Sequence, residues 1–252
     1  MSNFPRFHCP TALNTGDELV LPAGTAKHVQ VRRMQPEDLI TLFNGEGGEF
    51  QATVLRMGRS EVTVRLGKKI EASRELNVRV NLWCGITANE RMDWLVEKAT
   101  ELGASSLLPI TAERSVLKLK GERSDKKLAH WQAIAVAASE QCGRNHVMAL
   151  TPPSTLAQAL LEKHSSQTPK LRWILSLAAG TKTLSAALAD AQNSPHPSPL
   201  EVTVLSGPEG GLSPSEEAQA LAAGFVPVTL GPRVLRAETA PVAVLSVLGA
   251  LT

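Results

Sequence analysis

Short stretches that either alternate apolar and polar residues or run apolar characterise the first part of the chain. Three of them follow one another between glycine-containing turns, at residues 39–43, 49–55 and 61–66. A period of two is typical of β-strands that bury one face, and short strands bounded by turns favour a small barrel. We therefore expect an OB-like β-barrel domain over residues 1–72, a polar linker around residues 68–77, and a second domain over residues 73–252.

The pattern changes at Val78, where apolar runs of strand length begin to alternate with segments of helical periodicity. The expected helices span residues 89–102, 128–142, 214–223 and from about Pro241 onward. The expected strands span residues 78–86, 106–110, 173–177, 202–205 and 225–230. Strands that alternate with helices are typical of a mostly parallel sheet covered on both faces. We therefore predict an α/β fold for the second domain.

Composition narrows the class of protein. The chain has 252 residues, 43% of them hydrophobic and 20% charged, which suits a globular protein of one or two domains. No run approaches the eighteen or so apolar residues of a membrane span, and the first residues lack a signal-peptide pattern. The three cysteines are scattered and form no CxxC, which favours reduced thiols. We expect a cytoplasmic protein without a membrane partner.

The net charge of +2 does not by itself indicate nucleic-acid binding. Local basic clusters, one of which holds Lys27, His28, Arg32 and Arg33, could contact phosphates. They could equally form a solvated surface with neighbouring acids such as Glu37 and Asp38. The charge pattern alone leaves both interpretations open.

Two glycine- and proline-rich loops each follow a short apolar strand in the last quarter of the chain. The first covers residues 206–212 and the second residues 230–241. In α/β sheets, loops that leave the carboxyl ends of strands are where ligands bind. Ser213 and Glu216 form a capping-box pattern around Pro214, which predicts that the first loop leads directly into a helix.

The two loops differ in their chemistry. The first contains Glu209 and matches neither GxxxxGK[ST] nor GxGxxG, so a neutral or cationic ligand fits it better than phosphate. The second carries Arg233, Arg236 and Glu238 at the start of an apolar helix, which would fix them rigidly. They could act on a substrate, or an arginine could pair with Glu238 in a structural turn. No HExxH, GxSxG or CxxC occurs, and we expect no metal.

The loops and three further segments resemble a known family. The loop sequences are SGPEGGL at residues 206–212 and LGPRVLRAETA at residues 230–240; the other segments are EKATELG at 97–103, EQCGR at 140–144, and residues 28–34 with 42–45. Together they are similar to the SPOUT-class RNA methyltransferases, and more narrowly to the bacterial ribosomal RNA small subunit methyltransferase E family. That family makes N3-methyluridine in 16S ribosomal RNA of the small subunit.

The resemblance implies a trefoil knot in the second domain, with S-adenosylmethionine held among three loops at Leu175–Ala179, Leu205–Gly211 and Leu230–Arg236. It also implies a PUA-like first domain that holds RNA, and a homodimer. The cofactor-binding residues carried over to this chain are Leu175, Leu177, Ala178, Leu205, Gly207, Glu209, Gly210, Gly211, Leu230, Gly231, Val234, Leu235 and Arg236.

The implied reaction moves a methyl group from a sulfonium to uridine N3, whose proton must leave. We expect Arg236 to stabilise the uracil anion, and Glu238 or Glu140 either to accept the proton or to orient an arginine. The expected RNA contacts are Arg6, Lys27, His28, Arg32, Arg33, Arg114 and Arg144. Two other classes stay open: a non-catalytic RNA-binding factor for ribosome assembly, and a phosphate-binding hydrolase.

Overall fold

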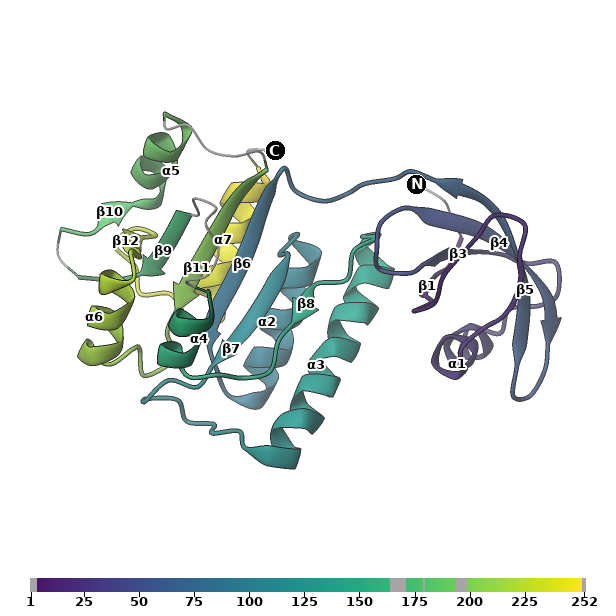
Figure 1. Ribbon diagram of the computed structural model, residues 1–252, viewed down its shortest axis with the longest axis horizontal. Helices are drawn as coiled ribbons and strands as arrows, with labels where there is room; N and C mark the ends of the chain where they lie inside the picture. The colour runs from purple at the N-terminus through teal and green to yellow at the C-terminus, as the bar shows by residue number, and fades with distance from the viewer. Residues whose placement is uncertain (1–3, 164–170, 179, 194–198, 251–252) are drawn as a thin grey trace. The chain divides into compact units, whose positions relative to one another are not determined.

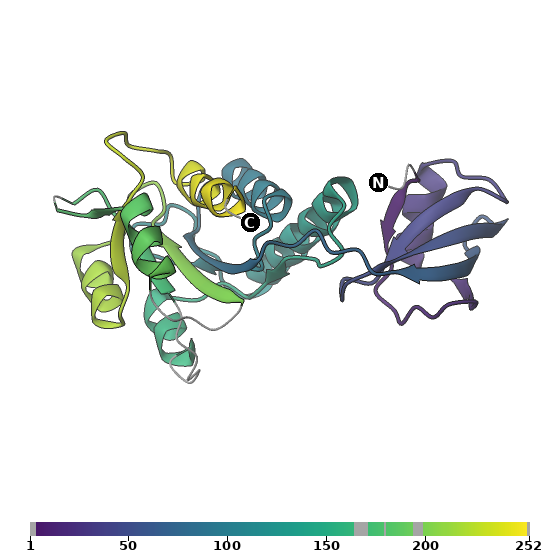
Figure 2. The same cartoon turned by 90° about the horizontal axis from the view of Figure 1, so that it is seen from above.

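The computed structural model describes residues 4–163, 171–178, 180–193 and 199–250. The chain forms two compact units (Figures 1 and 2). The first contains the residues up to Glu75 together with Val136–Val147. The second contains Leu76–Ala135 and the residues from Met148 onward. Among the described residues, no helix is both long and apolar enough to cross a membrane.

The first unit is built on a five-stranded sheet. Its strands, in the spatial order β1-β3-β4-β5-β2, are β1 (Arg6–His8), β3 (Leu39–Phe43), β4 (Glu49–Met57), β5 (Val62–Ile70) and β2 (Glu18–Val20). All neighbours are antiparallel except β1 and β3. Its core is made by the inward-facing residues of the alternating strands, among them Ile40, Val54 and Val64, which are completely buried. The β-rich first domain predicted from the sequence is confirmed.

One helix of this unit was not predicted. Helix α1 (Ala23–Val31) packs on the sheet through Thr25, Ala26 and Val29. Only two of these buried residues, Ala26 and Val29, are apolar, so the segment lacks the apolar stripe that marks most amphipathic helices. That is why the sequence pattern gave no signal for it.

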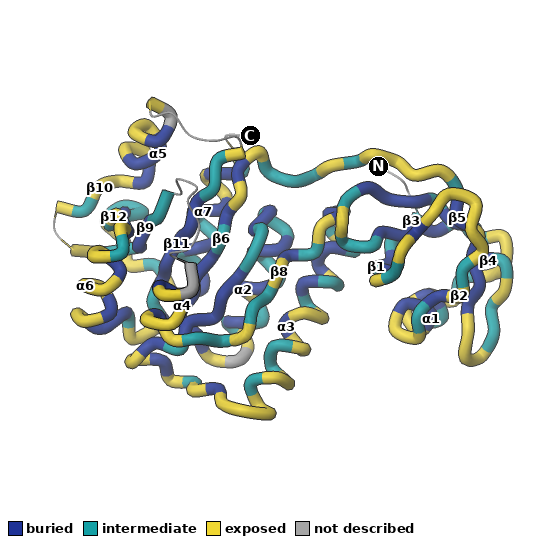
Figure 3. Tube along the Cα trace, viewed as in Figure 1, coloured by how far each residue is buried: buried dark blue, intermediate teal, exposed yellow. Residues whose placement is uncertain are grey.

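The second unit contains a sheet of seven strands in which every neighbouring pair is parallel. The order is β10 (Lys182–Thr183), β12 (Val226–Thr229), β9 (Leu171–Leu175), β11 (Leu200–Ser206), β6 (Val78–Gly85), β7 (Ser106–Ile110) and β8 (Ala149–Leu150). Central strands are buried on both faces, as Figure 3 shows for β6, β7 and β11. The predicted parallel α/β sheet is confirmed, while the trefoil knot stays a prediction.

Helices cover both faces of this sheet. They are α2 (Asn89–Glu101), α3 (Gly121–Cys142), α4 (Leu156–Lys163), α5 (Leu184–Gln192), α6 (Pro214–Ala222) and α7 (Thr239–Gly249). Helices α2 and α7 pack together on one face, and α4 and α6 on the other (Figure 2). Helices α4 and α5 were not predicted, and α3 begins earlier than expected because its first turns are polar and largely exposed.

Strand order brings distant loops together. Strands β12, β9 and β11 are neighbours in the sheet and run in the same direction. Their carboxyl ends therefore meet at one edge, where the segments after Leu175, Ser206 and Thr229 leave the sheet. The two glycine-rich loops singled out in the sequence meet at this edge.

Candidate active site

A cleft of about 490 Å³ lies at the edge where β9, β11 and β12 end. This volume is within the range of small-molecule sites. The lining residues come from the three loops, from the start of α2 and from α6: Arg91, Leu175, Ser176, Leu177, Ser206, Gly207, Pro208, Glu209, Gly211, Leu212, Glu217, Val228, Leu230, Arg233, Val234, Leu235, Arg236, Ala237 and Ala240. The cleft lies entirely within the second unit.

Most of the residues predicted to bind a cofactor line this cleft. Those that do are Leu175, Leu177, Gly207, Glu209, Gly211, Leu230, Val234, Leu235 and Arg236. Four others, Ala178, Leu205, Gly210 and Gly231, are not in the lining, and Leu205 is completely buried in the core. Ala179, the end of the first predicted loop, lies outside the described residues.

The loop after β11 is held tightly against the sheet. A side chain at Gly85, the last residue of β6, would place its Cβ 2.2 Å from the backbone nitrogen of Pro208. Such an approach is impossible without moving the loop, so only glycine fits here. The predicted capping box is present: the Ser213 amide donates to Glu216 Oε2 at 2.8 Å, and the Glu216 amide donates to Ser213 Oγ at 3.2 Å.

Arg114 braces the same loop from the other side. Its guanidinium donates to the carbonyl oxygens of Gly210 at 3.3 Å and Leu212 at 3.2 Å. The neighbouring amide of Glu113 donates to Glu216 Oε1 at 3.0 Å. Arg114, which the sequence suggested as an RNA contact, therefore holds the loop after β11 in place in this structure.

Arg91, like Glu217, is a charged lining residue that the sequence analysis missed. It lies in the first turn of α2, and its Nη1 donates to Glu209 Oε1 at 3.2 Å. The same carboxylate oxygen accepts the Ala88 amide at 3.1 Å. Arg91 follows β6, and the loop after β6 carries no glycine-rich motif. Only the pairing of β6 with β11 brings Arg91 to the loop after β11, and the sequence does not show that pairing.

Arg233 and Arg236 are exposed at the wall of the cleft. Within the part of the chain that the structure describes, neither forms an ion pair. Glu238, in contrast, is buried, and the Nε atom of Arg91 lies 3.9 Å from its Oε1. The structural turn considered above, with an arginine of this loop paired to Glu238, is not formed.

The cleft combines three kinds of surface. Leucine and valine side chains give apolar walls, and the loops add backbone polar groups. Glu209 and Glu217 supply carboxylates, and Arg233 and Arg236 supply cations that are free to contact an anion. These groups can hold a ligand that has an apolar part and a cationic centre, beside arginines that can contact an anion. Among the described residues, no cluster of metal-ligating side chains occurs.

A second cleft, of about 680 Å³, lies within the first unit. Glu140, from the end of α3, lines it with His28, Arg32 and Arg6. The Glu140 carboxylate accepts the His8 amide at 2.9 Å and lies 3.6 Å from His28 Nδ1. The structure thus brings Glu140 to the expected RNA contacts and not to the lining of the first cleft. Lys27, Arg32 and Arg33, which are close to His28 in the sequence, are exposed. None of them forms an ion pair with a described residue.

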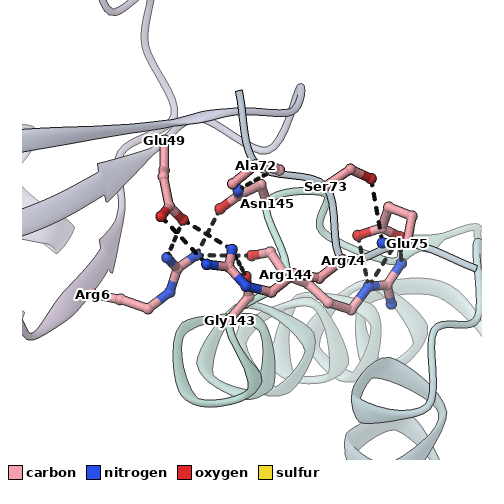
Figure 4. A network of polar contacts seen from close by, with 9 residues as sticks. All are labelled: Arg6, Glu49, Ala72, Ser73, Arg74, Glu75, Gly143, Arg144 and Asn145. Carbon is pink, nitrogen blue, oxygen red and sulfur yellow. Dashed lines mark hydrogen bonds and ion pairs between the residues drawn. The ribbon is translucent and has the colours of Figure 1, made fainter. Parts of the chain in front are cut away.

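Two other expected RNA contacts belong to a polar network (Figure 4). Arg6 Nη1 and Arg74 Nη1 donate to Glu49 Oε2 at 2.5 Å and 3.0 Å. Burial acts to raise the pKa of Glu49, but the hydrogen bonds and charges of the two arginines outweigh burial and lower it.

Arg144 forms an ion pair with Glu75 in the same network. Arg6 also donates to the Asn145 side chain at 2.7 Å, and Asn145 in turn donates to the Ala72 carbonyl at 2.8 Å. Arg144 is only 3% exposed, so its guanidinium is held inside the protein. The network joins the barrel strands to the segments around residues 72–75 and 143–145, which indicates a structural role for these arginines.

Comparison with known families gives two matches. The model of an RNA methyltransferase domain matches residues 74–249, and that of an RNA methyltransferase PUA domain matches residues 21–67. Among curated relatives, ribosomal RNA small subunit methyltransferase E of Bacillus subtilis is 30% identical over 94% of this chain and 89% of its own length. The protein of that name from Mycobacterium bovis is also 30% identical, over 98% of this chain and 91% of its own.

Two solved structures are similar over almost their full length. A putative methyltransferase from Legionella pneumophila, in complex with the cofactor S-adenosylmethionine, has a TM-score of 0.87 and 35% identity, and the match covers 99% of this chain and 98% of that one. Ribosomal RNA small subunit methyltransferase E from Neisseria gonorrhoeae, bound to S-adenosylmethionine, has a TM-score of 0.86 and 33% identity, with the same coverage.

Proposed function

Because the chain belongs to the ribosomal RNA small subunit methyltransferase E family, we propose that it transfers the methyl group of S-adenosylmethionine to N3 of a uridine in 16S ribosomal RNA. The observation that carries this proposal is the cleft at the ends of β9, β11 and β12, where Arg233 and Arg236, which form no ion pair with any described residue, stand beside apolar walls. This arrangement suits a reaction in which the substrate gains negative charge.

The cleft offers the cofactor its own set of contacts. S-adenosylmethionine, when bound, supplies a methyl group on a positively charged sulfur. Leu175, Leu230 and Leu235 would pack against its ring, and the backbone around Gly207 and Gly211 would contact its polar edges. The solved relatives bind this cofactor and share the whole fold. The fold therefore supports the same cofactor as the residues that line the cleft.

The transfer step balances without a metal. The bond between sulfur and methyl carbon breaks, its electron pair stays on sulfur, and a bond forms from N3 to the methyl carbon. The N3 proton must leave, because the neutral imide nitrogen has a delocalised lone pair. Arg236, at the wall of the cleft, would stabilise the charge on the uracil oxygens. Glu238, which is buried beside Arg91, would either take the proton or orient that arginine.

We further propose that the first unit holds the RNA. Lys27, His28, Arg32 and Arg33 form an exposed basic set in and just after α1, and phosphate contacts of this kind position RNA. Arg6 and Arg144 are not included because their charges are already neutralised by carboxylates. We also propose that the protein is a homodimer in the cytoplasm. Each chain would have two domains, at residues 1–72 and 73–252.

The test uses assembled small ribosomal subunits from a strain that lacks this protein. The purified protein is incubated with them and with S-adenosylmethionine labelled in the methyl group, and methylated uridines are mapped by mass spectrometry. The proposal predicts one N3-methyluridine in 16S RNA. Cofactor binding by calorimetry without any methylated RNA, or no binding at millimolar cofactor, would favour the RNA-binding assembly factor instead.

A further inference from the structure

The second cleft holds a carboxylate that the proposed function leaves without a role. Glu140, near the end of α3, lines this cleft together with His28 of α1 and Arg32, the residue that caps α1. The Oε1 atom of Glu140 accepts the His8 amide at 2.9 Å and lies 3.6 Å from His28 Nδ1. One oxygen is therefore held by the protein, which fixes where the carboxylate stands.

The other oxygen of Glu140 is available to a ligand. No described residue donates a hydrogen bond to Oε2, and this atom is not among the buried polar atoms that lack a partner. The side chain is 16% exposed, so a molecule that enters the cleft can reach it. An ionised carboxylate only accepts hydrogen bonds. The group that meets Glu140 must therefore carry N–H or O–H donors.

Part of the wall of the second cleft is apolar. Phe4, Pro5 and Val31 belong to the lining, and Val31 is 72% exposed although its side chain is apolar. A concave apolar surface of this kind can pack against a flat ring, and unstacked bases of RNA are held in this way. The cleft volume of about 680 Å³ is within the range of small-molecule sites, so a nucleotide fits.

Arg32 supplies a cation that is free to contact a phosphate. It lines the cleft, is exposed, and forms no ion pair with any described residue. The other arginines of the lining, Arg6 and Arg74, are both paired with Glu49. The apolar wall, the carboxylate and the free cation match the three parts of a nucleotide, namely its ring, the donor edge of its base and its phosphate.

We propose that the second cleft takes one unstacked guanine nucleotide of the RNA, with Glu140 accepting hydrogen bonds from the base and Arg32 contacting the phosphate. The inference rests on the proposed function, in which RNA is the substrate. Lys27 and Arg33, which are exposed and close to Arg32 in the sequence, can hold phosphates on either side of the nucleotide. They favour a polynucleotide over a free nucleotide as the occupant.

The chemistry of the base edges selects guanine. Guanine carries a ring N–H and an amino group side by side, so both can face a carboxylate. In adenine and cytosine the amino group stands next to a ring nitrogen that only accepts, and in uracil the imide N–H stands between two carbonyl oxygens. Those acceptors would meet the acceptor-only carboxylate of Glu140 unfavourably.

The experiment measures, by fluorescence anisotropy, the Kd of the full-length protein for short labelled oligouridines whose central base is guanine, hypoxanthine, adenine or uracil. We expect the wild type to bind the guanine probe at least about fivefold more tightly than the adenine probe, with hypoxanthine, which lacks only the amino group, in between. Glu140→Gln should bring all four Kd values within about twofold, because an amide offers both a donor and an acceptor.

Arg32→Ala should act differently from Glu140→Gln. It removes a phosphate contact, so it should weaken binding of all four probes alike and reduce the dependence of the Kd on salt. Glu61→Gln is the matched control, since Glu61 is exposed between β4 and β5 and does not line the cleft. It should change neither the affinity nor the preference for guanine.

A wild-type protein that binds the guanine and adenine probes equally, or binds neither, would overturn the inference, and this result needs no variant to fold. An equal loss on all probes in Glu140→Gln would also overturn it, because the carboxylate would then only hold His8 and His28 in place. So would free guanosine monophosphate that competes as strongly as the guanine probe. A guanine preference without any N3-methyluridine in the mapping experiment would instead overturn the proposed function, so the two failures are distinguishable.

Discussion

Two sets of arginines, one in each unit of the molecule, play opposite parts. In the first unit, Arg6, Arg74 and Arg144 are tied to Glu49 and Glu75 in a network that is largely inside the protein. In the second unit, Arg233 and Arg236 stand at the wall of the cleft without ion pairs among the described residues. The residue type is the same, but the partners differ.

The comparison shows which structural features of an arginine indicate its role. A buried guanidinium that already meets a carboxylate cannot turn to RNA without leaving an uncompensated charge inside the protein. An exposed guanidinium without a partner loses only solvation when a substrate anion arrives, so it can strengthen its contacts as charge develops. The burial and pairing of an arginine therefore predict its role better than its place in a basic cluster.

The largest expected effect is on the stability of the first unit. Glu49→Ala leaves Arg6 and Arg74 without their shared carboxylate, which we expect to cost about 3–5 kcal/mol. Urea unfolding followed by far-UV circular dichroism measures this loss. All four tryptophans lie in the second unit, so their fluorescence follows that unit separately and should change less.

The matched control for Glu49 is Glu18→Ala in the same sheet. Glu18 pairs with Arg65 at 2.7 Å, but both side chains are more than half exposed, so the loss should stay below about 1 kcal/mol. Equal destabilisation by the two variants would show that burial of the Glu49 network contributes nothing.

The next expected effect is on cofactor binding in the cleft of the second unit. In Gly85→Ala the new methyl group would collide with Pro208, so the loop after β11 must move. We expect the Kd for S-adenosylmethionine to rise at least about tenfold, which corresponds to about 1.4 kcal/mol. Isothermal titration calorimetry provides the measurement.

Gly24→Ala in α1 is the control for the glycine substitution. No atom lies within 4 Å of the added methyl group there, and the backbone is helical, so alanine should be neutral or slightly stabilising. Unchanged cofactor affinity in Gly85→Ala would mean that the loop tolerates displacement and that its tight packing does not shape the site.

The smallest expected effect is a pH dependence of the Glu49 network. Because the folded pKa of Glu49 is lowered, its ionised form stabilises the fold above the unfolded pKa of about 4.3. That stability is lost as the pH falls from there through the lowered folded value. The difference in unfolding free energy between the wild type and Glu49→Gln should therefore be constant from about pH 6 to 8 and narrow below about pH 4.5. A difference that persists unchanged to pH 3 would contradict the proposed charge pairing.

Much of the fold could be predicted from the sequence, for identifiable reasons. The central strands of the second unit are buried on both faces, so Val202-Thr203-Val204-Leu205 reads as a strand without reference to anything distant. The capping box at Ser213 and Glu216 is local as well. Helix α1 was missed because it buries small residues, and strand order was beyond reach because it depends on contacts far apart in the chain.

The candidate site could be predicted only in part. The glycine-rich loops revealed the cleft because the residues that shape it are consecutive. Arg91 carries no local signal, since it reaches the cleft only through the pairing of β6 with β11. Arg6 and Arg144 lie about 140 positions apart, so the sequence could not show that the Arg144 carbonyl and the Asn145 side chain both meet Arg6.

The most direct test of the contrast between paired and unpaired arginines is single-turnover methyl transfer to small ribosomal subunits by Arg236→Ala. Arg79→Ala, at the opposite edge of the same sheet, is the control. Because Arg236 is expected to act on the charged transition state, the transfer rate should fall at least about 100-fold while the Kd for S-adenosylmethionine stays within about threefold. A transfer rate near that of the wild type would contradict the assignment of Arg236 to catalysis.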